Sequence, residues 1–97
     1  MKIAYQGIEG SYSESCSKEM YPDCKTISCK TFDDVFKKAS EDEEVRAIIP
    51  ESNRTTGNIG VEYLIFKYRL NIYQILKIKL KQLLHPSLAL IFIILKF

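Results

Sequence analysis

The sequence predicts an α/β fold in which a mostly parallel sheet is flanked by helices. Three short apolar segments, 2–6, 25–29 and 45–49, have the length and the residue types of strands. Each of them is followed by a segment with helix-forming signals. Strands that alternate with helices indicate a parallel sheet with right-handed crossover connections.

The first helix is predicted over residues 12–20. Ser11 and Glu14 fit a capping box, in which a serine and a glutamate three residues later satisfy the first backbone N–H groups of a helix. Apolar residues that recur every four positions give this helix one apolar face. The residues of that face are Tyr12, Cys16 and Met20.

Two more helices are predicted from capping and periodicity. Thr31 begins the second helix, and Asp34 occupies its capping-box position. The third helix is expected after Gly57. Each has an apolar stripe at helical spacing. The stripes are Phe32, Val35, Phe36 and Ala39 in the second helix and Val61, Leu64, Ile65 and Tyr68 in the third.

The segment from residue 71 onward gives a weaker signal. Leu76, Ile78 and Leu80 alternate with lysines, which indicates a half-exposed strand. Leu88–Leu95 is an apolar run, but it is shorter than the roughly 20 residues that a membrane-spanning helix needs. We interpret residues 74–97 as a strand or helix without an evident partner surface. A weak interfacial membrane anchor is the less favoured alternative.

Composition bounds the class of protein. At 97 residues with 46% hydrophobic and 27% charged residues, the chain is long enough for one small globular domain. The net charge of +2 is too small to indicate a nucleic-acid partner. Charge is uneven, because residues 1–57 carry eight basic and eleven acidic residues (−3), whereas residues 58–97 carry six and one (+5).

Cysteine usage and the N-terminus indicate a cytoplasmic protein without a metal site. The three cysteines lack a Cys-x-x-Cys spacing and the single histidine is distant in sequence, so no zinc site is expected. The N-terminus runs directly into a predicted strand, and no signal peptide is expected. Reduced cysteines in the cytoplasm are the preferred interpretation.

Two predicted loops could hold a ligand. In an open α/β sheet, ligands bind outside the carboxyl ends of the strands, where Gly7–Ser13 and Pro50–Gly57 are expected. Arg54 adds one positive charge that suits a carboxylate. Neutral donors in the loops are Ser11, Ser13, Ser52, Asn53, Thr55 and Thr56. The loops therefore favour a small carboxylic acid, although Ser, Thr and Asn are also common in ordinary caps and turns.

Three segments in this order resemble the prephenate dehydratase family. Gly7–Ser13 resembles the family's Gly-x-x-Gly-Ser/Thr-Tyr/Phe-Ser loop. Cys29–Phe36 resembles its Thr-Phe-x-Asp-Val-Phe helix start, and Ala47–Gly57 resembles its Ile-Pro-Ile-Glu-Asn-Ser-x-x-Gly segment. The resemblance covers about residues 2–73. Residues 74–97 are a basic, apolar tail that departs from the family.

The resemblance implies a fold and an activity. Members convert prephenate to phenylpyruvate, water and carbon dioxide in phenylalanine biosynthesis, without a metal or an organic cofactor. Their catalytic domain has two α/β lobes like those of type II periplasmic binding proteins, of which this chain would form one incomplete lobe. The implied catalytic residues are Asn53 and Ser52. The implied substrate-binding residues are Gly10, Ser11, Tyr12, Ser13, Arg54, Thr55, Thr56 and Gly57.

The sequence also departs from the family pattern. Ser52 stands where the family has Glu, and Arg54 stands where it has Ser. The family's Thr-Arg-Phe motif has no counterpart. We therefore expect a truncated dehydratase that is inactive alone. The alternative hypothesis is a non-catalytic module that binds a small carboxylate. The least favoured hypothesis is a membrane-surface protein. Self-association through the tail is expected, so removing residues 83–97 should raise solubility.

Overall fold

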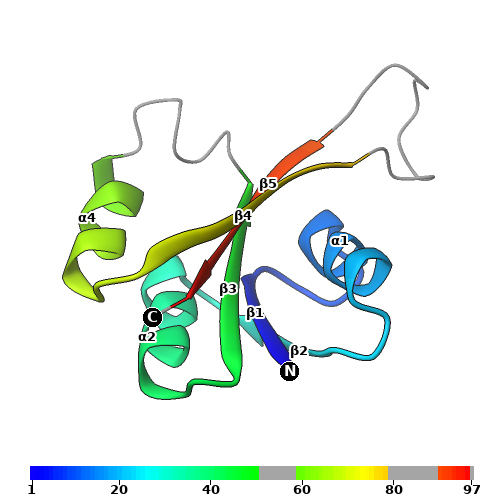
Figure 1. The fold of residues 1–97 in the computed structure, drawn as a ribbon, viewed down its shortest axis with the longest axis horizontal. Helices are drawn as coiled ribbons and strands as arrows, with labels where there is room; N and C mark the ends of the chain where they lie inside the picture. Colours follow the sequence, from blue (N-terminus) through cyan, green and yellow to red (C-terminus); the bar gives the residue numbers. More distant parts are fainter. Residues whose placement is uncertain (51–58, 79–89, 97) are drawn as a thin grey trace.

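The sheet has five strands in the order β2-β1-β3-β5-β4 (Figure 1). The structure is a computed structural model that describes residues 1–50, 59–78 and 90–96. Its elements are β1 (Lys2–Gln6), α1 (Tyr12–Met20), β2 (Lys25–Cys29), α2 (Phe32–Glu41), β3 (Val45–Pro50), α4 (Ile59–Lys67), β4 (Asn71–Ile78) and β5 (Leu90–Lys96). The predicted α/β class is confirmed, and so is every strand and helix expected before residue 50.

Four of the five strands run in the same direction. β1 pairs in parallel with β2 and with β3, and Ala4 lies beside Ile27 on one side and Ala47 on the other. β5 is antiparallel to both of its neighbours, β3 and β4. The pairing is therefore parallel on the side of β2 and antiparallel on the side of β4, and the sheet as a whole is mixed.

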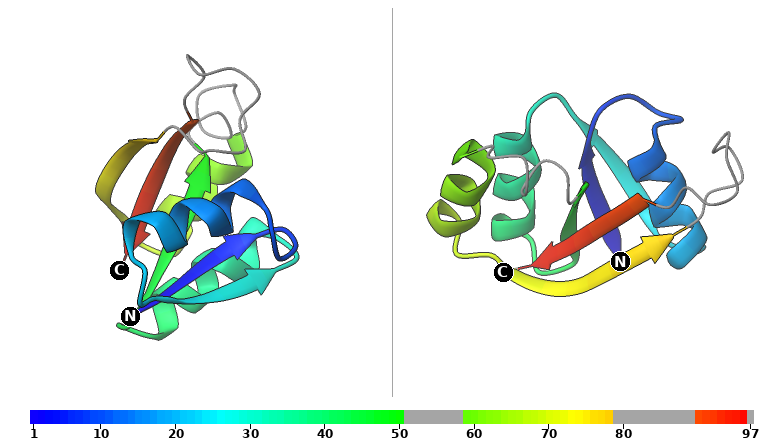
Figure 2. Two further views of the ribbon diagram at one scale, coloured as in Figure 1. Left: turned by 90° about the vertical axis from the view of Figure 1, so that its right-hand side faces the viewer. Right: turned by 90° about the horizontal axis from the view of Figure 1, so that it is seen from above.

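Helices cover both faces of the sheet, with α2 and α4 on one face and α1 on the other (Figure 2). The alternation of side chains along each strand separates two cores. On β3, for example, Ala47 and Ile49 belong to the core under α2 and α4, whereas Ile48 belongs to the core under α1.

The predicted starts and stripes of α2 and α4 are confirmed where they are described. The Thr31 hydroxyl accepts a hydrogen bond from the Asp34 backbone N–H at 3.1 Å, as a capping residue does. Three of the stripe residues of α2 are buried and Phe32 is half-buried. Leu64, Ile65 and Tyr68 pack against the same core. The side chain of Val61 lies outside the described residues.

A polar contact joins α2 to the end of α4. The Tyr68 hydroxyl donates to the Asp33 carboxylate at 2.8 Å, and the Lys67 ammonium lies 3.5 Å from the same carboxylate. The two helices therefore meet through charged and hydroxyl groups as well as through the apolar core.

The buried face of α1 differs from the predicted one. Cys16 is buried as expected, but Tyr12 and Met20 are 45% and 37% exposed. Ser13 and Ser17 complete the buried face instead, and the Ser17 hydroxyl donates to the Ser13 carbonyl at 2.8 Å. Small side chains let a helix approach a sheet closely, and a serine that bonds its own helix does not bring an unsatisfied hydroxyl into the core.

The C-terminal segment has a partner surface, contrary to the sequence-based interpretation. β5 lies between β3 and β4, and Ile93 pairs with Ile49 on one side and with Ile75 on the other. Burial is nearly complete for four consecutive β5 residues, whose exposed fractions are 0–1%: Phe92, Ile93, Ile94 and Leu95. The alternation of Leu76 and Ile78 falls on β4 as expected, whereas Leu80 lies outside the described residues.

Candidate functional site

The carboxyl ends of β1, β2 and β3 meet at one edge of the sheet. Gln6 pairs with Cys29, the last residue of β2. The β1–β3 register pairs Ala4 with Ala47, so β3 ends at the same edge. This edge is where an open α/β sheet places a ligand.

The first predicted loop follows β1 at this edge and begins with a left-handed turn. Gly7 and Gly10 have φ angles of +133° and +88°, which residues with a Cβ rarely adopt. The Gly7 N–H donates to the Cys29 carbonyl at 3.0 Å, and the Ser11 N–H donates to the Ile8 carbonyl at 3.2 Å. Both glycines are therefore required by the backbone path, and the loop is anchored to β2.

Helix α1 begins with the predicted cap. The Ser11 hydroxyl accepts from the Glu14 N–H at 3.4 Å. In return, one oxygen of the Glu14 carboxylate accepts from the Gly10 N–H at 3.0 Å. The glutamate thus reaches one residue further back than in the usual capping box.

The same carboxylate also connects two strands. Its other oxygen accepts from the Tyr5 hydroxyl at 3.1 Å and from the Thr26 hydroxyl at 3.0 Å. The hydrogen bond from Gly10 is the main cause that lowers the pKa of the Glu14 carboxyl below its usual 4.5, and burial opposes it. Burial and the bond to Glu14 raise the pKa of the buried Tyr5 hydroxyl. Glu14 therefore connects the loop, α1, β1 and β2.

This arrangement corrects part of the sequence-based prediction. Gly10 and Ser11 were expected to bind substrate, but the backbone N–H groups of both are hydrogen-bonded within the protein and cannot be donated to a ligand. The Glu14 carboxylate already lies at the positive end of the α1 dipole. A second anion at that point would be repelled, so the start of α1 does not offer a place for a ligand carboxylate.

The predicted substrate-binding residues differ in accessibility. Gly10 and Tyr12 are exposed, Ser11 is half-buried, and Ser13 is only 8% exposed. The structure therefore leaves Gly10, Ser11 and Tyr12 at the surface of the loop. Both predicted catalytic residues and the other predicted site residues of the second loop lie outside the described residues: Ser52, Asn53, Arg54, Thr55, Thr56 and Gly57.

Polar residues that the sequence analysis did not select line a hollow at this edge. Its volume is about 470 Å³, and Gln6, Gly7, Ser28 and Lys30 contribute to its wall together with Ile8 and Cys29. The Gln6 amide donates to the Lys30 carbonyl at 3.2 Å, and the Ser28 hydroxyl donates to the Gly7 carbonyl. From the sequence, the signal that could have indicated Lys30 as a site residue is its position directly after a predicted strand.

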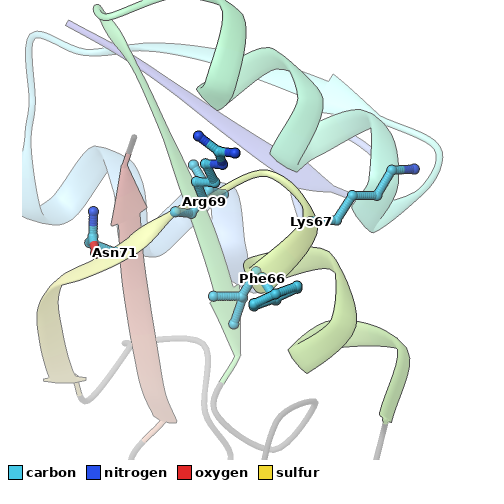
Figure 3. A pocket seen from close by; sticks show the side chains of 6 residues that line it. Phe66, Lys67, Arg69 and Asn71 are labelled. Atoms are coloured by element: carbon cyan, nitrogen blue, oxygen red, sulfur yellow. The ribbon is translucent and has the colours of Figure 1, made fainter.

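A larger hollow lies at the opposite edge. It has a volume of about 570 Å³ and is formed where α4 leads into β4, which begins level with the start of β3. Figure 3 shows the Lys67 side chain extending away from Arg69 and Asn71. The Lys67 ammonium also forms an ion pair with the Asp33 carboxylate. These polar groups do not converge, and the hollow is a weaker candidate than the carboxyl edge.

The described residues give little support for a metal site, a cysteine nucleophile or a membrane-spanning helix. Residues 1–50, 59–78 and 90–96 contain no cluster of His, Cys, Asp and Glu that would hold a metal ion. Burial raises the pKa of the Cys16 thiol to about 12, so this cysteine is not a nucleophile near neutral pH. No helix in the described part of the chain is long and apolar enough to cross a membrane.

Replacing Glu14 should remove the contribution of its ionised carboxylate to the pH dependence of the free energy of unfolding. Because the folded pKa of Glu14 is lowered, its stabilisation is present above about pH 4.5 and is lost as the pH falls through the folded value. We expect Glu14→Gln to lower the free energy of unfolding by about 1–2 kcal/mol at pH 7 and by less at pH 3. Urea unfolding at both pH values measures this difference.

Glu19→Gln is the matched control, because Glu19 is an exposed residue of the same helix. It should change the free energy of unfolding by less than about 0.5 kcal/mol at either pH. An equal loss for Glu14→Gln at pH 7 and at pH 3 would contradict the assigned role of the ionised carboxylate.

Comparison with known proteins identifies the family. The family model for prephenate dehydratase matches residues 3–90, which reaches past residue 73, where the resemblance was expected to end. The chain is 34% identical over 85 residues to arogenate dehydratase 2 of Petunia hybrida, which covers 87% of this chain and 22% of that protein. It is 33% identical over 85 residues to arogenate dehydratase/prephenate dehydratase 2, chloroplastic, of Arabidopsis thaliana, with the same coverage. The chain thus spans about a fifth of the length of these relatives.

Two solved structures share the fold. A prephenate dehydratase from Streptococcus mutans has a TM-score of 0.71 and 24% identity, and the match covers 100% of this chain and 50% of that one. GqqA, described as a novel type of quorum quenching acylase, has a TM-score of 0.77 and 21% identity over 98% of this chain and 46% of that one. At these identities the likeness concerns the fold. Because the family model covers most of the sequence, we conclude that the chain belongs to the prephenate dehydratase family.

Proposed function

We propose that residues 1–97 form one wall of a binding site for a cyclic dicarboxylate of the prephenate or arogenate type. The observation that carries this proposal is the loop after β1, where Gly7 and Gly10 adopt positive φ angles at the carboxyl edge of the sheet. Family membership supplies the ligand class. The residues that line the hollow beside this loop include a lysine and no acidic residue, which suits a carboxylate better than a cation.

The reaction proposed for the whole enzyme is the loss of hydroxide and carbon dioxide from such a dicarboxylate in aromatic amino-acid biosynthesis. The departing hydroxide needs a proton or a strong hydrogen-bond donor, because it is a poor leaving group. Asn53 and Ser52 are proposed for this side of the site on sequence grounds. Gly10, Ser11 and Tyr12 would contact the substrate from the loop after β1, and Ser13 would support that loop from the buried face of α1.

Residues 1–97 alone are proposed to bind without turnover. They contain no Thr-Arg-Phe motif. They also match only half of the chain of the solved prephenate dehydratase, so one wall would leave the substrate open to water. A non-catalytic carboxylate-binding module remains the alternative function. For the isolated 97 residues, both functions imply binding without turnover, and they differ only in what the whole protein does.

An assay of the purified 97-residue chain tests this proposal. Prephenate should show a saturable heat signal in titration calorimetry, while phenylpyruvate should form no faster than in protein-free buffer. Tyr63→Ser, a change at a 61% exposed position on α4, is a control that should not alter binding. Protein-dependent and saturable formation of phenylpyruvate would overturn the proposed inactivity. The absence of a binding signal would overturn the proposed site.

Three further features stay predictions from the sequence, drawn in turn from cysteine usage, from the small net charge and from the apolar tail, whose segment β5 has a partner surface in the sheet. They are a cytoplasmic location, the absence of a nucleic-acid partner, and self-association of the chain. Cell fractionation tests the first, a gel-shift experiment with DNA and RNA tests the second, and sedimentation over a range of concentrations tests the third. A chloroplast or membrane fraction, a shifted nucleic-acid band or a monomer at all concentrations would contradict the corresponding prediction.

A further inference from the structure

Lys30 occupies a distinctive place at the carboxyl edge of the sheet. It directly follows β2 and helps to line the hollow beside the loop after β1. Several backbone N–H and C=O groups nearby already form hydrogen bonds within the protein. The Gly7 N–H is bound to the Cys29 carbonyl, the Gly7 carbonyl accepts from Ser28, and the Lys30 carbonyl accepts from Gln6. Among the described residues that line this hollow, Lys30 is the charged one.

The Lys30 ammonium is also not neutralised by the described part of the chain. Within residues 1–50, 59–78 and 90–96, no carboxylate forms an ion pair with it. A neighbouring hollow of about 390 Å³ shares Ser28, Cys29 and Lys30. Its wall contains three lysines and two acidic residues, which leaves one positive charge: Lys30, Lys37, Lys38, Asp34 and Glu41. The side chains that line this second hollow therefore have a net formal charge of +1.

We infer that Lys30 makes the site discriminate between a keto dicarboxylate and the corresponding amino dicarboxylate. This inference rests on the proposed function. Prephenate carries two carboxylates, whereas arogenate carries the same two and an ammonium in place of the keto group. An ammonium attracts the dianion more strongly and repels the added cation. Specificity is the difference between the resulting binding free energies of the two ligands. Lys30 thus favours the keto acid.

Charge-neutral substitution of Lys30 tests the inference. Affinities for prephenate and arogenate are measured by titration calorimetry at low ionic strength with the 97-residue chain and with Lys30→Gln. An exposed ion pair of this kind corresponds to a change of about two- to fivefold. Lys30→Gln should weaken prephenate binding by that factor and bring the affinities for the two ligands closer together. Lys30→Arg, which keeps the charge, should retain the preference for prephenate.

Lys25→Gln is the matched control. Lys25 is also exposed, and it lies at the opposite end of the same strand. It should leave both affinities unchanged, and equal thermal midpoints of the variants would show that folding is preserved. An unchanged preference in Lys30→Gln, with wild-type binding intact, would overturn the role of Lys30 and leave the proposed function standing. If the wild-type chain bound neither compound, the proposed function would fail and this inference with it.

Discussion

Removing residues 83–97 should unfold the chain. The deletion takes away β5, which separates β3 from β4 in the sheet. Its buried side chains belong to both cores, because Phe92 and Ile94 pack on the α1 side and Ile93 and Leu95 on the α2 side. Burying four large apolar side chains stabilises a fold by about 6–12 kcal/mol. This is close to the whole stability of a small domain, about 5–15 kcal/mol.

Circular dichroism and urea unfolding of the shortened chain measure this effect. We expect loss of the cooperative transition and increased aggregation, because β3 would present an unpaired apolar edge. This reverses the expectation drawn from the sequence, in which the same deletion raises solubility. Ile72→Ser, a change at a 41% exposed position on β4, is a control that should keep the cooperative transition. A soluble shortened chain with wild-type unfolding behaviour would contradict the position of β5.

Phe36→Ala should cost about 3–5 kcal/mol of the free energy of unfolding. The Phe36 side chain has an exposed fraction of 0% and lies near the middle of α2. Its ring is 6.4 Å from that of Phe32, centre to centre, and it packs in the core formed by α2, α4 and the sheet. Truncation would leave a cavity that the surrounding strands cannot readily fill.

Phe66→Ala provides a matched control for this substitution. Phe66 is 83% exposed on α4, so the same chemical change should alter the free energy of unfolding by less than about 0.5 kcal/mol. Urea unfolding of both variants gives the comparison. Similar losses for Phe36→Ala and Phe66→Ala would show that α2 does not pack as described.

Local signals were enough to predict the elements of the first half of the chain. The start of α2 depends on Thr31 and the Asp34 N–H, which are three residues apart, and the structure contains this contact. The stripe of α2 is also a local pattern, and it points to the core as predicted. The buried face of α1 was harder to predict. Apolar spacing suggested Tyr12 and Met20, but close packing on the sheet selects smaller side chains.

Contacts between distant segments could not be predicted in the same way. Nothing within residues 90–96 specifies pairing with β3, because strand pairing depends on which edges the rest of the fold leaves open. Glu14 illustrates the same limit at the site. Its capping role follows from Ser11, whereas its bonds to Tyr5 and Thr26 depend on how β1 and β2 lie beside α1.

The most direct test of the central claim is a titration of the isotopically labelled 97-residue chain with prephenate, followed through backbone amide shifts. If the carboxyl edge binds the substrate, saturable shifts should be concentrated at residues 7–13 and 28–30. The hollow at the opposite edge, residues 65–71, should remain unchanged. Saturable shifts confined to residues 65–71, or no saturable shifts at all, would contradict the claim that the loop after β1 forms a wall of the substrate site.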